Sequence, residues 1–210
     1  MTLKTLPFIF GPLQNNTILI YDLSNSEAAV IDPAMNCGLL LDTIVANNLH
    51  IKYILMTHGH FDHFGGLSQL LEKFPGKIDI CLHKDDFLLW KSKGNANEFG
   101  FDLATPPDPS ILVEDRQILK LGEEEIEVRY TPGHTPGHVV YYSKTAQTVF
   151  CGDLIFDHGV GRTDLAGGDF NRLARSIHEQ IFPLPDETRL ICGHGPETTV
   201  GTEKKENPFI

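Results

Sequence analysis

The chain lacks the basic surface that would mark a nucleic-acid-binding protein. Its 17 Lys and Arg residues are outnumbered by 28 Asp and Glu residues, which gives a formal net charge of −11. The longest basic run is the pair Lys204-Lys205. A polyanion would therefore be repelled by most of the surface, and nucleic acid is not an expected partner.

Long apolar runs and closely paired cysteines are also missing. No apolar run approaches the roughly 20 residues that span a bilayer, so no membrane contact is expected. Residues 6–10 (LPFIF) are too short for the apolar core of a signal peptide and contain a proline. The cysteines are widely spaced and form no CxxC pair, namely Cys37, Cys81, Cys151 and Cys192. Such thiols are typically reduced and buried, which predicts a cytoplasmic location.

One short stretch, residues 58–63 (HGHFDH), lies between an expected strand and an expected helix. The apolar run at residues 53–56 is typical of a buried strand. After the stretch, apolar residues recur at positions 67, 70, 71 and 74, which is the spacing of one helix face. Three imidazoles and a carboxylate are therefore predicted on the loop where a core strand ends.

The side chains of this loop are suited to metal binding. In an extended loop, residues two apart project to the same side, so His58, His60 and Asp62 are predicted to point together. Gly59 permits a close backbone approach, and His63 joins the group as the chain turns toward the helix. Imidazole and carboxylate are ligands of Zn, Fe and Mn, and four such ligands exceed what one ion needs. Two metal ions are expected, and a solvated polar loop is the alternative.

The remaining pattern predicts one α/β domain over residues 1–210, a length that suits a single core. Strands are expected at residues 17–21, 28–31, 51–57, 78–82, 126–130, 139–142, 148–151 and 188–192. Helices are expected at residues 40–45 and between Asp169, a possible N-cap, and Pro183. Both halves combine strands with helices, which predicts two sheets face to face with helices outside. The long polar stretch at residues 92–110 is expected to be a loop, either a flap or a surface excursion.

Three further strand ends each place a glycine beside a side chain that can bind a metal. His134 follows the strand at 126–130, Asp153 follows the strand at 148–151, and His194 follows the strand at 188–192. Functional side chains gather where strands end, so these three are predicted to complete the site on one rim of the sandwich. His138, in the repeated Thr-Pro-Gly-His sequence, is expected to form a structural hydrogen bond instead.

In order and spacing, these side chains resemble the metal-binding set of the binuclear hydrolases of the metallo-β-lactamase fold. The resemblance implies a four-layer αββα sandwich that binds two divalent ions, Zn foremost, or else Fe or Mn. One ion would be held by His58, His60 and His134. The other would be held by Asp62, His63 and His194, with Asp153 bridging both. Asp62 and Asp153, with a metal-bound water, are the catalytic groups that the resemblance implies.

A narrower resemblance covers nearly the whole chain. Residues 14–16 (QNN), 152–156 (GDLIF), 159–164 (GVGRTD) and 203–209 (EKKENPF) are similar to the glyoxalase II group. They are most similar to its short bacterial members, which lack a C-terminal helical domain. The resemblance implies hydrolysis of a small-molecule thioester such as a hydroxyacylglutathione.

Arg162 is the candidate for substrate binding. It matches a lysine that binds a substrate carboxylate in the long glyoxalase II enzymes, and an arginine can do so with two hydrogen bonds. These enzymes have a tyrosine where this chain has Asp164. An ion pair between Arg162 and Asp164 that holds the loop is therefore the alternative.

Two other functions are compatible with the same residues. The run at residues 159–164 also resembles persulfide dioxygenases, which share the fold and use a single iron. A protein in which the ions only stabilise the fold, without turnover, is the third possibility.

Overall fold

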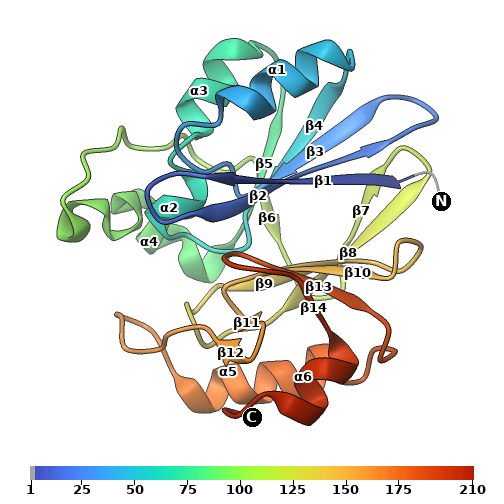
Figure 1. The fold of residues 1–210 in the computed structure, drawn as a ribbon. Helices are drawn as coiled ribbons and strands as arrows, with labels where there is room; N and C mark the ends of the chain where they lie inside the picture. The colour runs from blue at the N-terminus through green and yellow to red at the C-terminus, as the bar shows by residue number, and fades with distance from the viewer. Residues whose placement is uncertain (1–2) are drawn as a thin grey trace.

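The computed structural model describes residues 3–210 and contains two six-stranded sheets packed face to face (Figure 1). The N-terminal sheet contains, from edge to edge, β1 (Leu3–Phe10), β2 (Asn15–Asp22), β3 (Glu27–Ile31), β4 (His50–Leu55), β5 (Asp79–His83) and β6 (Ile111–Val113). The C-terminal sheet contains, from edge to edge, β14 (Thr198–Thr199), β13 (Arg189–Cys192), β10 (Thr148–Gly152), β9 (Val139–Ser143), β8 (Glu124–Tyr130) and β7 (Ile118–Leu121). A small hairpin joins β11 (Ile155–Phe156) to β12 (Gly159–Val160).

Helices cover the outer face of each sheet, above and below in Figure 1. The N-terminal half contains α1 (Gly38–Ala46), α2 (Phe61–Phe64), α3 (Leu67–Lys73), η1 (Lys84–Asp86), α4 (Phe87–Lys91) and η2 (Lys93–Phe99). The C-terminal half contains α5 (Phe170–Ser176), the π-helical turn η3 (Ile177–Ile181) and α6 (Val200–Glu206). The predicted αββα sandwich is therefore confirmed. No helix within residues 3–210 is long and apolar enough to cross a membrane.

The hydrophobic core is divided among the three interfaces between these four layers. Between the sheets, Leu55 of β4 belongs to the same buried cluster as Tyr141 of β9 and Phe150 of β10. The outer clusters pack Trp90 and α1 on one sheet, and Leu173 and η3 on the other. Because β3 to β6 are parallel and covered on both faces, their central strands are apolar runs rather than alternating ones.

Several elements differ from the sequence-based prediction. The strand β1 was not predicted because Pro7 interrupts it, but β1 is an edge strand, where proline is tolerated. The helix predicted from the apolar positions 67, 70, 71 and 74 is present as α3, but the short helix α2, within the histidine-rich stretch itself, was expected to be loop. The stretch at 92–110 is not all loop, since η2 occupies its first part. Asp169 is the N-cap of α5, as predicted, and its side chain accepts a hydrogen bond from the Arg172 amide.

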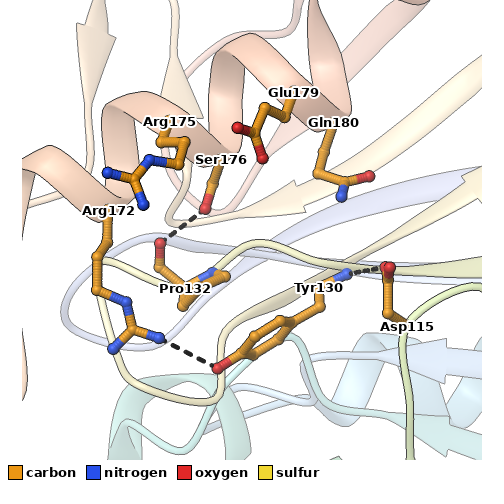
Figure 2. Close-up of a pocket in the computed structure, with 8 residues that line it drawn as sticks. All are labelled: Asp115, Tyr130, Pro132, Arg172, Arg175, Ser176, Glu179 and Gln180. Carbon is orange, nitrogen blue, oxygen red and sulfur yellow. Dashed lines mark hydrogen bonds between the residues drawn. The ribbon is translucent and has the colours of Figure 1, made fainter.

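The topology brings the predicted ligands to one rim. β8 and β10 are each antiparallel to β9, and β10 is parallel to β13, so β8, β10 and β13 all end at the same side. Figure 2 shows how α5 supports the loop that follows β8: Ser176 donates a hydrogen bond of 2.8 Å to the carbonyl of Pro132. None of the predicted site residues lines the 250 Å³ cavity drawn there.

Candidate metal centre

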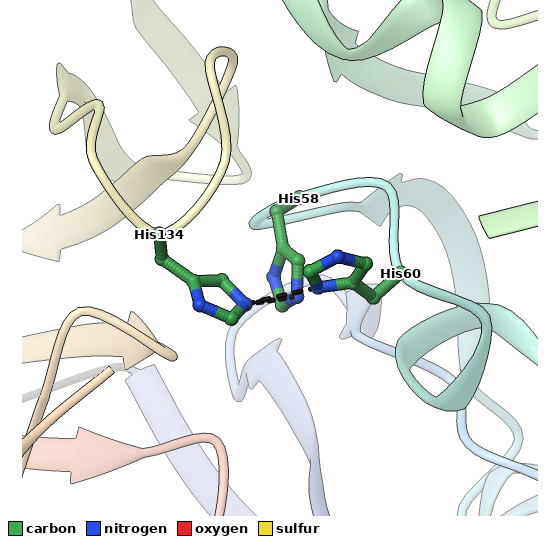
Figure 3. Close-up of side chains that lie close together, drawn as sticks. All are labelled: His58, His60 and His134. Carbon is green, nitrogen blue, oxygen red and sulfur yellow. Dashed lines mark hydrogen bonds between the residues drawn. The ribbon is translucent and has the colours of Figure 1, made fainter. Parts of the chain in front are cut away.

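Three imidazoles meet at one point (Figure 3). His58 and His60 come from the loop after β4, and His134 comes from the loop after β8. The Nε2 atom of His134 lies 2.9 Å from Nδ1 of His60 and 3.2 Å from Nε2 of His58. Ligand nitrogens of a tetrahedral zinc ion, each about 2.0–2.1 Å from it, lie about 3.3 Å apart. Three buried nitrogens at these separations fit one shared cation, because a single proton cannot satisfy all three.

A second cluster lies beside the first. The Oδ2 atom of Asp62 is 3.6 Å from Nε2 of His63 and 3.4 Å from Nε2 of His194. One ligand atom from each of the three residues lies close enough to the others for all three to bind the same ion. Asp62 therefore does not point with His58 and His60, and the extended-loop expectation was wrong there. The chain is extended only to His60 and then enters α2, where successive side chains turn by about 100° rather than 180°.

The carboxylate of Asp153 faces both clusters. One oxygen, Oδ1, lies 3.4 Å from Nε2 of His63. The other, Oδ2, lies 3.7 Å from Nε2 of His134 and 3.7 Å from Nε2 of His194. Asp153 comes directly after β10, in the middle of the rim, which explains its position between the two groups.

The donor atoms of these clusters fit divalent cations. The buried atoms without a hydrogen-bond partner among residues 3–210 include Nε2 of His63 and Oδ1 of Asp153, which face one another. Burial and the neighbouring imidazoles hold the pKa of His58 well below its usual value, so this ring is neutral with a free lone pair. Neutral imidazoles combined with ionised carboxylates form a donor set for Zn, Fe or Mn.

Both carboxylates of the site are ionised at neutral pH. Burial opposes ionisation of Asp62, but His63 and hydrogen bonds from His194 and Asn15 lower the pKa of Asp62 to about 2. Burial likewise opposes ionisation of Asp153, and the neighbouring imidazoles hold its pKa well below the usual range. The carboxylates therefore present negative oxygen to both clusters. Burial opposes protonation of His63 and His194, but the same carboxylates raise the pKa of both rings, so a cation would replace protons there.

The second nitrogen of several rings is held by the protein, which orients the first. Nδ1 of His134 donates to the carbonyl of Arg162 over 2.8 Å, and Nδ1 of His194 donates to the carbonyl of Leu13 over 2.9 Å. In both rings the proton must then be on Nδ1, which leaves Nε2 free as a ligand atom.

Asp32 supports His63 in the same way and was not predicted. This buried carboxylate accepts a 2.9 Å hydrogen bond from Nδ1 of His63 and a 2.6 Å bond from Oγ1 of Thr57. Its position directly after β3 was the available signal, because the other site residues also follow strand ends. His138, as predicted, is buried next to the clusters and hydrogen-bonded through Nδ1 to Oγ1 of Thr131, at 2.9 Å.

Two cavities open onto the centre. The smaller, of about 220 Å³, is lined by Leu13, His60, Phe61, Asp62, Phe99, His134, Asp153, Arg162, Leu165 and His194. The larger, of about 490 Å³, is lined by Asp153, Phe156, Asp157, Val160, Arg162, His194, Gly195 and Pro196. Phe99 lies at the end of η2, so the stretch at 92–110 does contribute a wall of the site.

Arg162 borders both cavities, but its guanidinium is engaged by a carboxylate. Nε of Arg162 lies 2.7 Å from Oδ1 of Asp164, and Nη2 lies 2.8 Å from Oδ2. Both side chains are exposed. The ion pair that the sequence left as an alternative is thus present, at the edge of both cavities.

The chain is similar along most of its length to known proteins. It is 38% identical over 203 residues, 94% of this chain and 93% of the relative, to hydroxyacylglutathione hydrolase GloC of Haemophilus influenzae. It is also 38% identical over 205 residues, 95% of this chain and 94% of the relative, to the probable metallo-hydrolase YqgX of Bacillus subtilis.

Solved structures share the fold. The BLEG-1 B3 metallo-beta-lactamase superposes with a TM-score of 0.90 and 34% identity, over 98% of this chain and 99% of the other. TTHA1623 in a di-iron-bound form superposes with a TM-score of 0.88 and 36% identity, over 98% of this chain and 100% of the other. ETHE1 from Myxococcus xanthus superposes with a TM-score of 0.81 and 25% identity, over 98% of this chain and 83% of the other. The family model of the Metallo-beta-lactamase superfamily matches residues 10–194. The chain belongs to the metallo-β-lactamase superfamily.

Proposed function

We propose that the chain is a binuclear metal-dependent hydrolase that cleaves thioesters, in the manner of the hydroxyacylglutathione hydrolases. The observation that carries the proposal is the carboxylate of Asp153, which presents one oxygen to His63 and the other to His134 and His194. A carboxylate so placed could contribute one oxygen to each cluster if both clusters bound a cation. The similarity to GloC, along nearly the whole chain, supports the thioester as substrate.

The protein would hold one cation through His58, His60 and His134, and the other through Asp62, His63 and His194. When bound, such a pair lowers the pKa of a shared water toward ~7 and polarises a carbonyl oxygen. Asp62 and Asp153 remain anionic at neutral pH, so they can accept a hydrogen bond from a water between the clusters and orient it toward the carbonyl. The leaving thiolate, with a pKa of about 8.5, needs no acid from the protein.

The chain offers no alternative nucleophile at the centre. Among the described residues, no serine, cysteine or lysine lines either cavity. Cys151 and Cys192 precede site loops but are buried, and burial raises the pKa of Cys192 to about 12. Attack by an oriented water is therefore the chemistry that the residues favour.

The two cavities suggest how a thioester would lie. Leu13, Phe61 and Phe99 give the smaller cavity an apolar wall, which suits a short acyl group. The larger cavity, next to Arg162, has room for the thiol-bearing part of the substrate. The scissile carbonyl would then lie at Asp153, which lines both.

An assay with S-D-lactoylglutathione and a panel of other thioesters tests the proposal. Hydrolysis without oxygen uptake is expected. The competing function is a mono-iron persulfide dioxygenase, which the sequence at residues 159–164 also resembles. Oxygen consumption with glutathione persulfide would favour it, whereas turnover of a β-lactam alone would favour a lactamase. Absence of turnover with every substrate would leave metal binding as the function.

A further inference from the structure

Two buried polar side chains that belong to neither cluster lie next to the metal centre. Asp86, at the end of η1, is fully buried, and Asn15, the first residue of β2, is 1% exposed. We propose that Asp86 positions only the three-histidine cluster, and that Asn15 positions only the cluster of Asp62, His63 and His194. The proposal rests on the metal binding in the proposed function, and it does not depend on the identity of the substrate.

Asp86 ties together the two loops that supply all three imidazoles of the first cluster. Its Oδ2 atom accepts hydrogen bonds from the Gly59 amide at 2.8 Å and from Oγ1 of Thr135 at 2.7 Å. Its Oδ1 atom accepts a third bond, of 2.6 Å, from the Gly137 amide. Gly59 lies between His58 and His60, and Thr135 directly follows His134. One carboxylate therefore fixes the spacing of the loops on which the imidazoles are mounted.

Both loops pack closely against the backbone of Asp86. A Cβ atom on Gly137 would lie 2.4 Å from the backbone nitrogen of Asp86, and one on Gly59 would lie 3.3 Å from its carbonyl oxygen. A side chain larger than glycine therefore does not fit at position 137, and the contact at Gly59 is tight.

A change in the hydrogen-bonding of Asp86 should move the backbone beside the three imidazoles, and the imidazoles with it. Asp62 and His63 come from the same loop but have separate supports, since Asn15 bonds to Asp62 and Asp32 bonds to His63.

Asn15 contacts the second cluster directly. Its Nδ2 atom donates to Oδ2 of Asp62 at 2.9 Å and lies 3.3 Å from Nε2 of His194. The backbone of Asn15 also forms an isolated β-bridge with His194. The side-chain bonds of Asn15 within residues 3–210 go to this cluster and not to the three histidines. Asn15 therefore orients the carboxylate oxygen that a cation would use.

Substitutions of the two residues should each weaken a different metal site. In Asp86→Asn, the amide NH2 must face at least one backbone N–H donor, and the two donors repel. Affinity at the three-histidine cluster should fall about 10- to 100-fold, the usual cost of losing such a supporting contact, while the second cluster keeps its affinity. Asn15→Leu keeps the branching of the side chain but removes the donor, and it should weaken only the second cluster by a similar factor.

Titration of the metal-free chain with Co2+, followed by visible absorption, tests this directly. His134→Ala and His194→Ala provide the reference spectra of a chain with one intact cluster each. Asp86→Asn should weaken the Co2+-binding step that His134→Ala lacks. Asn15→Leu should weaken the step that His194→Ala lacks.

Equal weakening of both steps in both variants, or no weakening in either, would overturn the proposal. If Asp86→Asn fails to fold, Thr135→Val decides in its place, because it removes one of the three bonds to Asp86 and preserves side-chain shape. Two normal Co2+ steps in wild type without any thioester turnover would refute the proposed function, and would leave this proposal standing.

Discussion

Replacement of Arg162 by alanine separates substrate recognition from loop stabilisation. In the structure, Asp164 occupies Nε and Nη2 of Arg162, at 2.7 and 2.8 Å, which leaves Nη1 for a substrate carboxylate. One charge-assisted hydrogen bond contributes about 1.5–3 kcal/mol, or roughly 10- to 150-fold in kcat/KM. If the bond is equally strong in the ground and transition states, the loss appears as a raised KM with little change in kcat.

Steady-state kinetics on two thioesters, one with a carboxylate in its thiol and one without, provide the assay. The loss should shrink for the second thioester, because it has no carboxylate for Arg162 to bind. Arg189→Ala is the matched control, since Arg189 pairs with Glu197 at 2.6 Å and does not line either cavity. An equal loss on both thioesters, or a lower melting temperature with an unchanged KM, would refute the recognition role.

Three further predictions concern the centre itself. Asp153→Ala should bind fewer than two metals per chain and lose more activity than the roughly 10- to 100-fold cost of an outer contact; two retained metals would show that Asp153 does not bridge. Gly94→Ala should lower the melting temperature and metal affinity together, because Gly94 has a φ of +60° and its Cβ would lie 2.3 Å from the Phe61 amide nitrogen; unchanged values would contradict that packing. In the metal-free protein, Asp62 and Asp153 have lowered pKa values and stabilise the fold above about pH 4. Burial tends to lower the pKa of His63, but the nearby carboxylates raise it, so the stabilisation by protonated His63 is lost as the pH rises above about 6.5. Melting temperatures measured against pH with and without Zn2+ should show this decline only in the metal-free protein.

The loops that carry the candidate ligands could be predicted because each follows a recognisable strand. His134, Asp153 and His194 are each the first metal-competent side chain after such a strand, and the fold brings those strand ends together. The division of the side chains at residues 58–63 between the two clusters was harder to predict from the sequence. It depends on where α2 begins, and a one-turn helix after His60 has too few residues to give a periodic signal.

The supporting roles of Asp86 and Asn15 could not be identified from the sequence, and the only signal for Asp32 was that it follows a strand end. Asp32, Asp86 and Asn15 contact loops that are 25 to 179 residues away along the chain, and no local spacing relates them to the ligands. The strand β1 escaped prediction for a different reason. Its solvent-facing edge permits Pro7 and needs no apolar alternation.

The metal content of the purified protein tests the central claim most directly. Elemental analysis should find two divalent ions per chain, and the same preparation should hydrolyse S-D-lactoylglutathione or a related thioester without consuming oxygen. One iron per chain, together with oxygen consumption on glutathione persulfide, would contradict the binuclear hydrolase.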